Sequence, residues 1–369
     1  MYPLLAILSL GFLIVVHEGG HYFVARWCKM RIERFSIGFG PGILKRQSKK
    51  TGTTFQLAPI PFGGFVEIRG MNIAEDVDPD DKFAYPNRPA WQRFVTIFAG
   101  PATNYLSAMV LSFALFTCHG QDSSWKFYSV ASVKDDYDAK GKLEVGDRIM
   151  AVDGVPILAA GIYQPKDGPV MTSDSLVKRV NAKDGAPLTI RVLRAGRTLD
   201  IVVNPKPGKD DDGKPIIDPD TKKQVYLLGI VPHQSADVVK VGILTAAKDS
   251  VTYPVDVAGR ILTGIREIIT GKEDADPGGP KRIYDEFTRA WQLGADTGVQ
   301  LLIVLSVYLA LFNLFPLPAL DGGRLVFLSY ELITRRRANP KIEAMVHMGG
   351  IMVLGVVMIL VTLRDCHVI

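Results

Sequence analysis

The sequence predicts a polytopic α-helical membrane protein with a small β-element at the membrane and an α+β domain outside it. Three features of the 369 residues indicate this fold class. Four apolar runs are long enough to cross a hydrocarbon core of about 30 Å. A stretch rich in glycine, proline and β-forming residues follows the first run, and a long polar segment with short strand-like runs separates the second run from the third. We therefore expect four transmembrane helices.

The apolar runs cover residues 3–25, 94–116, 299–317 and 349–363. With their flanks, they predict spans over residues 1–28, 93–118, 297–334 and 342–364. The first run has no basic residue before it and no small-residue cleavage site after it. We therefore expect it to remain in the protein as a span and not to be removed as a signal peptide.

Basic residues flank the expected spans on one side. They follow the first span, precede the second and link the third to the fourth: Arg26, Lys29, Arg31, Arg34, Arg88, Arg93, Arg335, Arg336, Arg337 and Lys341. Because cytoplasmic loops are enriched in Lys and Arg, we expect these loops in the cytoplasm and both termini outside. The formal net charge of +5 follows from this topology, so no nucleic acid is expected as a partner.

The first span carries ionisable residues that a lipid-facing helix would not tolerate. The stretch His17-Glu18-Gly19-Gly20-His21 interrupts the apolar run. On a helix, His17 and His21 lie one turn apart on the same face, so both imidazoles can hold one metal ion while Glu18 polarises a water molecule. This is the HExxH pattern of zinc hydrolases. The alternative is an ordinary core helix with satisfied polar groups, which is disfavoured because unpaired polar groups in lipid are costly.

The segments that flank the external domain and the first span differ in character. Residues 29–92 form the expected cytoplasmic-side loop, where alternating apolar residues on both sides of Lys50-Thr51-Gly52 predict a membrane-associated β-hairpin or small sheet. The apolar run 59–66 is expected to approach the membrane against protein. Residues 206–296 are expected to form a linker and amphipathic juxtamembrane helices, which lie on the membrane surface or pack on the external domain.

Residues 126–205 contain a run that is typical of a peptide-binding domain. Between Leu143 and Gly154 the sequence reads L-x-x-G-D-x-I-x-x-V-x-G, which predicts a strand that ends in an Asp-Gly turn. A short helix over 173–180 and a hairpin around Ala195-Gly196 are expected to follow. This segment resembles a PDZ domain, and PDZ domains bind peptides by adding a strand to an exposed sheet edge.

The third expected span contains a broken helix and a carboxylate. Pro316 and Pro318 lie between Asn313 and Asp321. Two prolines so close together interrupt a helix, and irregular backbone at membrane depth requires protein or a water-filled cavity around it. Asp321 is therefore expected at a site, where two histidines and one carboxylate leave a fourth zinc position for water. Asn104 in the second span either bonds between helices or faces the metal.

Together these motifs resemble those of the site-2 protease family of intramembrane zinc metalloproteases, specifically its RseP-type members. The chain has HExxH in the first span, G-P-x-x-N at residues 100–104, the PDZ-like segment, and N-x-x-P-x-P-x-L-D-G from Asn313, in that order. The resemblance extends along essentially the whole chain. Many RseP-type members carry two tandem PDZ domains, whereas one clear copy is found here.

The resemblance implies a role for each motif residue. It makes Zn²⁺ the cofactor, His17, His21 and Asp321 the zinc ligands, and Glu18 the catalytic base. It also places four residues near the substrate, namely Asn313, Asn104, Pro316 and Pro318. The β-element after the first span corresponds to the membrane-associated β-element of the family.

The family resemblance implies hydrolysis of peptide bonds within transmembrane segments of single-pass membrane proteins. The expected setting is regulated intramembrane proteolysis of an anti-sigma factor after a first cleavage, with clearance of remnant signal peptides as the alternative. A non-catalytic metal-binding scaffold that presents a PDZ domain is the alternative of another class, and it would be expected to have lost Glu18 or Asp321. The expected partners are the substrate, a PDZ-bound peptide or ectodomain, and the lipid bilayer. The expected location is the bacterial inner membrane, with the PDZ-like domain periplasmic and the active site toward the cytoplasm.

Overall fold

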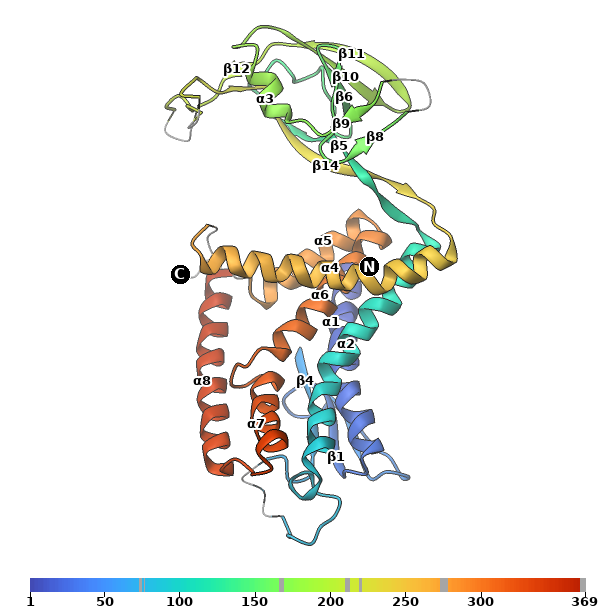
Figure 1. Ribbon diagram of the computed structural model, residues 1–369, viewed down its shortest axis with the longest axis vertical. Coiled ribbons are helices and arrows are strands. Elements are labelled where there is room, and N and C mark those ends of the chain that lie inside the picture. Colours follow the sequence, from blue (N-terminus) through green and yellow to red (C-terminus); the bar gives the residue numbers. More distant parts are fainter. Residues whose placement is uncertain are drawn as a thin grey trace. The chain divides into compact units, whose positions relative to one another are not determined.

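Four long apolar helices dominate the computed structural model, which describes all residues except 73, 74, 76, 166–168, 210–212, 219, 220, 273–277 and 366–369. The chain divides into two compact units, unit 1 (Met1–His119 and Val241–Ile369) and unit 2 (Gly120–Lys240). The helices that are long and apolar enough to cross a membrane all belong to unit 1 (Figure 1): α1 (Tyr2–Trp27), α2 (Ala90–Cys118), α6 (Ala295–Leu314) and α8 (Pro340–Asp365). The prediction of four membrane-length helices is therefore confirmed.

Helices α1 and α2 pack so closely that their backbones touch. A Cβ atom on Gly20 of α1 would lie 2.4 Å from the carbonyl oxygen of Ala99 on α2. The hydroxyl of Thr103 on α2 donates a hydrogen bond to the Val16 carbonyl of α1 at 2.9 Å. Small and hydroxyl residues are the side chains that allow such close helix packing in a membrane. This packing brings α2 against the polar stretch of the first span.

The third expected span is broken, as its prolines predict. Helix α6 ends at Leu314, and α7 (Asp321–Thr334) starts after a loop. Phe315 has an extended backbone, which the following proline favours, so the helix ends before the apolar run does. The loop folds back onto the first turn of α7: a Cβ atom on Gly322 would lie 2.0 Å from the Phe315 carbonyl oxygen. Only glycine fits there.

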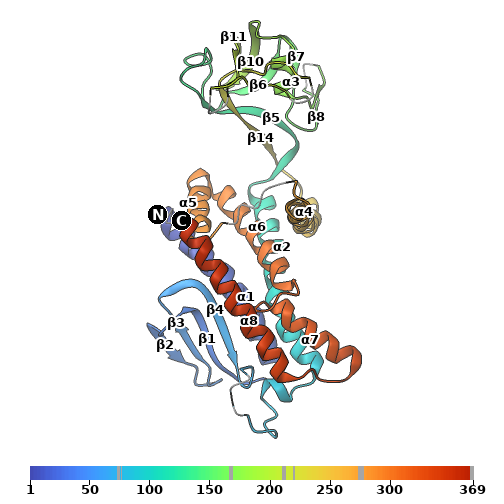
Figure 2. The same cartoon turned by 90° about the vertical axis from the view of Figure 1, so that its left-hand side faces the viewer.

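A four-stranded sheet follows α1 in unit 1. Its strands are β1 (Ile32–Phe39), β2 (Leu44–Gln47), β3 (Thr54–Leu57) and β4 (Ile60–Ile68), in the order β2-β3-β1-β4. The turn at Lys50-Thr51-Gly52 joins β2 to β3 as an antiparallel hairpin, whereas β1 pairs with β3 in parallel. The sheet lies along the half of α1 that is remote from α4 and α5 (Figure 2). The expected small sheet is therefore present, and β4 forms one of its edges.

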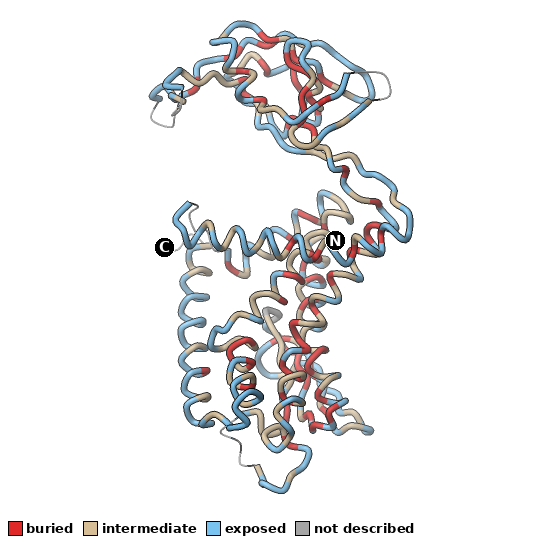
Figure 3. The backbone as a smooth tube through the Cα atoms, in the orientation of Figure 1, coloured by how far each residue is buried: buried red, intermediate tan, exposed pale blue. Residues whose placement is uncertain are grey.

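Unit 1 also contains a 3₁₀ turn and two further helices. A 3₁₀ turn, η1 (Tyr85–Asn87), precedes α2, and the amphipathic helix α4 (Ile243–Ile269) and α5 (Pro280–Leu293) precede α6. Helix α4 runs across the ends of the long helices and buries Ala246, Ser250 and Val257. Helix α8 is exposed along most of its length, whereas α1 and α2 carry buried stretches (Figure 3).

Unit 2 is built on a β-sheet. The path β11-β10-β6-β5-β14 uses β5 (Gln121–Val133), β6 (Arg148–Val152), β10 (Leu188–Arg194), β11 (Arg197–Val203) and β14 (Ile230–Val239). The other elements are short: β7 (Val155–Pro156), β8 (Ile162–Tyr163), β9 (Met171–Thr172), α3 (Leu176–Asn181), β12 (Lys206–Pro207) and β13 (Tyr226–Leu227). Strands β10 and β11 form the hairpin expected around Ala195-Gly196.

Unit 2 also includes part of the segment for which a linker was expected. Strand β14 pairs with β5 along almost its whole length, so residues 206–240 belong to the domain and the amphipathic helices follow it. The sequence of β14 conceals this strand because Pro232, His233 and Gln234 interrupt its apolar pattern. Leu143, Ile149 and Val152 of the PDZ-like run all lie in the apolar core of the unit.

Candidate metal centre

Helix α1 presents three polar side chains at one level of the first span. His17 and His21 are four residues apart, and their rings meet edge to face with centroids 4.9 Å apart. The side chain of His21 is 10% exposed and that of His17 is 14% exposed. Glu18, next to His17, is half-buried. The i, i+4 spacing thus gives a pair of imidazoles on one helix face.

Asp321 reaches the same point from a distant part of the sequence. It is the first residue of α7, and its Oδ2 atom lies 3.2 Å from Nε2 of His17 and 3.2 Å from Nε2 of His21. The two Nε2 atoms are 3.3 Å apart. Among the described residues, these three form the one group of His, Cys, Asp or Glu side chains close enough to share a metal ion.

A shared metal ion explains the positions of these three atoms better than hydrogen bonds among them do. Nδ1 of His21 donates to the Thr96 carbonyl oxygen at 2.8 Å, so Nε2 of a neutral His21 carries a lone pair. That lone pair faces Asp321 Oδ2, a buried oxygen without a hydrogen-bond partner. Tetrahedral zinc with bonds of about 2.1 Å separates its ligand atoms by about 3.4 Å, close to the observed spacing. The residues therefore fit a bound zinc ion.

Helix α2 forms the wall behind the two histidines. A Cβ atom on Gly100 would lie 2.3 Å from His21 Nε2 and 2.8 Å from His17 Cε1. Real Cβ atoms do not approach other heavy atoms so closely. A residue without a side chain is therefore needed where α2 passes the imidazoles.

The edge strand β4 runs past Glu18. A Cβ atom on Gly64 would lie 3.2 Å from Glu18 Cγ and 2.7 Å from Ile14 Cγ2, so the strand backbone is in contact with this face of α1. The backbone of Val66, two residues further along β4, is also near the Glu18 carboxylate. The carboxylate thus lies between the histidine pair and a sheet edge.

The other residues expected near the substrate lie in different surroundings. Asn104 on α2 is fully buried, and its Nδ2 atom lies 3.3 Å from Nδ1 of His17. Asn313 is half-buried in the penultimate position of α6, and Pro316 and Pro318 are exposed in the loop before α7. In the described part of the chain, these last three residues share no hydrogen bond or ion pair with the histidine cluster.

Two contributions to the centre were not identified from the sequence. The Thr96 main-chain carbonyl orients His21, and Gly100 has no side chain, which leaves space for both imidazole rings. A carbonyl group leaves no signal in a residue pattern. Gly100 could have been found, because it opens the G-P-x-x-N run, and a glycine in an apolar helix often marks close backbone approach.

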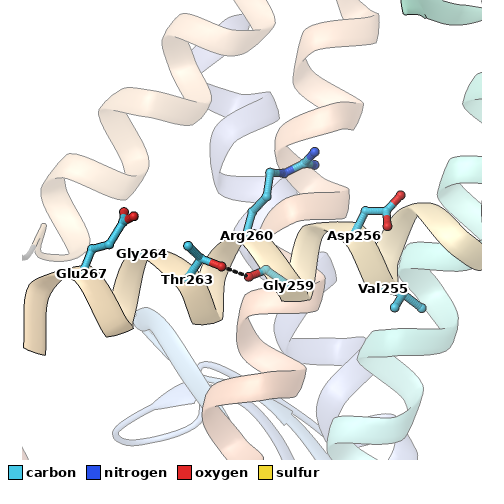
Figure 4. Close-up of a pocket in the computed structure, with 7 residues that line it drawn as sticks. All are labelled: Val255, Asp256, Gly259, Arg260, Thr263, Gly264 and Glu267. Carbon is cyan, nitrogen blue, oxygen red and sulfur yellow. Dashed lines mark hydrogen bonds between the residues drawn. The ribbon is translucent and has the colours of Figure 1, made fainter. Parts of the chain in front are cut away.

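A separate hollow follows the polar side of α4 (Figure 4). Its lining residues all come from this helix: Val255, Asp256, Gly259, Arg260, Thr263, Gly264 and Glu267. The Thr263 hydroxyl donates to the Gly259 carbonyl at 2.9 Å within the helix. Among the described residues that line it, Asp256 and Glu267 are carboxylates and none is a histidine or cysteine, so the hollow has no group comparable to His17, His21 and Asp321.

Comparisons with known proteins show the family to which the chain is similar. The sequence model of peptidase family M50 matches residues 5–357 of the chain. A protein of Agrobacterium fabrum named "Putative zinc metalloprotease" is 31% identical, over 97% of this chain and 94% of its own length. Proteins of Rickettsia conorii and Clostridium perfringens with the same description are each 30% identical, over 96% and 99% of this chain and 96% and 98% of their own lengths.

Proposed function

The chain belongs to peptidase family M50, the site-2 protease family, and from that premise we propose that it cleaves peptide bonds within transmembrane segments of other membrane proteins. As a family member it is a zinc metalloprotease with membrane-length apolar helices. One observation carries the proposal furthest. The HExxH helix is itself a membrane-length helix, so a substrate must bring its scissile bond to that helix within the bilayer.

In this proposal His17, His21 and Asp321 hold the zinc ion and Glu18 is the catalytic base. The ion supplies Lewis-acid chemistry and lowers the pKa of water toward about 7. Glu18 accepts the proton of the attacking water and later donates it to the leaving amine nitrogen. Its position beside His17, without belonging to the group of three, supports this division of roles. The low exposure of both imidazoles limits access of bulk water to the centre.

We assign substrate presentation to the edge strand β4. A scissile bond in a helix is shielded by the helix's own hydrogen bonds, so the substrate must unwind, and lipid offers no partners for the freed backbone groups. Addition of the unwound segment to β4 would provide them. The contact between Gly64 and Glu18 supports this assignment, because it brings the sheet edge to the catalytic base. Asn313, Pro316 and Pro318 are assigned to the same substrate path from the family resemblance.

Unit 2 is proposed to be a PDZ domain that restrains cleavage by excluding substrates with bulky external parts. The positions of the residues in its PDZ-like run support the PDZ fold. Leu143, Ile149 and Val152 fill the core, and Gly146 and Gly154 have positive φ angles of 93° and 76°, as tight turns require. Asp147 is 1% exposed at its side chain and pairs with Arg194. A folded external domain can select substrates by obstruction as well as by contact.

The proposed location is the bacterial inner membrane, with both termini and unit 2 outside and Glu18 toward the cytoplasm. The basic residues in the loops after α1 and before α8 support this orientation. The proposed substrate is a single-pass membrane protein. An anti-sigma factor that has already lost its ectodomain is favoured over a remnant signal peptide, because a domain that excludes bulky external parts acts only on substrates that differ in those parts.

A Glu18→Gln variant tests the proposed function. Glutamine keeps the shape of the side chain but cannot accept the proton, so cleavage of a model transmembrane substrate should fall by about 10²-fold or more. Zinc content should stay at the wild-type level, because Glu18 is not a ligand. Gly19→Ala is the matched control in the same motif, since its added Cβ would meet only Phe23 Cε2 at 3.9 Å. Wild-type turnover by Glu18→Gln would refute the mechanism.

A further inference from the structure

Asn104 contacts a residue of the proposed metal centre from behind. Its side chain lies on α2 with 0% exposure, and Nδ2 is 3.3 Å from His17 Nδ1, the ring nitrogen that faces away from Asp321. The carbonyl oxygen of the same amide is buried without a hydrogen-bond partner in the described part of the chain. An uncharged, fully buried amide with an unpaired oxygen needs a physical explanation.

The hydrogen bond of His21 Nδ1 indicates which hydrogen bond His17 Nδ1 needs if His17 is also a metal ligand. His21 Nδ1 donates to the Thr96 carbonyl oxygen, which leaves Nε2 with its lone pair toward Asp321. A metal-ligating histidine usually donates its other ring N–H to a carbonyl or carboxylate in this way. Thr96 and Asn104 are eight residues apart on α2, and Gly100 between them lies against both rings. Helix α2 therefore places one polar group next to Nδ1 of each histidine of α1, the Thr96 carbonyl at His21 and the Asn104 amide at His17.

We propose that Asn104 is the positioning residue for His17, with its carbonyl oxygen accepting the His17 Nδ1 proton and so leaving Nε2 free to bind the metal. This inference rests on the proposed function, because it takes His17 as a ligand. If the amide instead donated through Nδ2, Nδ1 would be the acceptor and the proton of neutral His17 would be on Nε2. That proton would occupy the point where the three ligand atoms meet. A half-turn of the amide exchanges its oxygen and nitrogen and removes the conflict.

A positioning role for Asn104 differs from a role in substrate binding. With 0% exposure, the side chain has no surface to offer a substrate, and the neighbouring Ser107 hydroxyl donates to its main-chain carbonyl at 2.8 Å. A positioning residue is expected to change metal affinity, whereas a substrate contact is expected to change KM and leave metal affinity untouched.

Zinc affinity of the purified full chain, measured by competition with a chromophoric chelator, tests the inference. Asn104→Leu keeps the approximate volume and removes the acceptor, so zinc affinity should fall about 10- to 100-fold. In its ionised form, the Asn104→Asp side chain keeps an oxygen acceptor and has no donor, so zinc affinity at neutral pH should stay within about threefold of wild type or increase. Ser107→Ala is the matched control one turn away, and it should bind zinc like wild type.

The variants distinguish the possible outcomes. Wild-type zinc affinity in Asn104→Leu, with or without a raised KM, would overturn the inference. If Asn104→Leu does not fold, Asn104→Asp still decides: a loss of tenfold or more would mean that the amide donates to His17, and the inference would fail. Failure of the proposed function would give a different result. In that case the wild-type chain would not bind zinc through His17, and His17→Ala would have the same zinc affinity as the wild type.

Discussion

Substitution of Gly100 by alanine is expected to disrupt the metal centre, although the residue contributes no ligand. The added Cβ would lie 2.3 Å from His21 Nε2, and ordinary contacts begin at 3.4 Å, so helix or ring must move by about 1.1 Å. The ring cannot simply swing away, because Nδ1 is held by the Thr96 carbonyl at 2.8 Å. Metal–ligand distances tolerate about ±0.2 Å. The required movement is several times larger.

We expect Gly100→Ala to lower zinc affinity by at least about tenfold and to destabilise the protein by about 1–3 kcal/mol through overpacking. The assay is chelator competition on the detergent-purified chain, together with thermal unfolding with and without zinc. Gly19→Ala serves as the control, because its Cβ has room and it lies in the zinc-binding motif itself. If Gly100→Ala and Gly19→Ala bind zinc equally well, the close approach of α2 to the imidazoles is wrong.

Two further predictions concern charged pairs in the two units. In unit 2, burial opposes ionisation of Asp147, but hydrogen bonds from Arg194 and the Glu144 backbone outweigh it and hold the pKa of Asp147 below its usual range. Its stabilising contribution is then complete above about pH 4 and is lost as the pH falls through the lower folded-state pKa. Hydrogen exchange of residues 120–240 in the full chain should show this loss of stability at low pH. The Asp147→Asn variant should not show this pH-dependent loss. In unit 1, Arg93 of α2 pairs with Glu331 of α7 at side-chain exposures of 6% and 17%. Arg93→Leu should cost about 3–5 kcal/mol in chemical unfolding, with partial recovery on adding Glu331→Leu; a cost below about 1 kcal/mol would contradict the buried pair.

The parts of the site that sequence predicts are those fixed by local spacing. Two histidines four residues apart on a helix must share a face, and two prolines must end α6 before Asp321. The meeting of Asp321 with the histidines could be expected because broken backbone and ionisable groups at membrane depth both need a protein-lined site. The structure places the candidate ligand atoms of His17, His21 and Asp321 within 4.8 Å of one another, and their role as zinc ligands is part of the proposed function.

The parts of the fold and the site that the sequence does not predict depend on contacts between segments that are far apart in the chain. Alternating apolar residues indicate strands, but they do not say that β1 pairs in parallel with β3 and leaves β4 at the edge. Strand β14 was expected as linker, because its polar residues and Pro232 hide a pairing that β5 provides. A main-chain carbonyl is common to every residue type, so the role of the Thr96 carbonyl becomes visible only in the folded structure.

X-ray absorption at the zinc edge of the purified full chain tests the central claim most directly. With one zinc ion held by His17, His21 and Asp321, the spectrum should show scattering from two imidazoles and light-atom ligands at about 2.0–2.2 Å, with no sulfur near 2.3 Å. Asp321→Ala should lose the ion or change this spectrum, and Glu18→Gln should preserve it. A sulfur ligand, or a spectrum that is the same with and without Asp321, would show that zinc binds elsewhere and contradict the account.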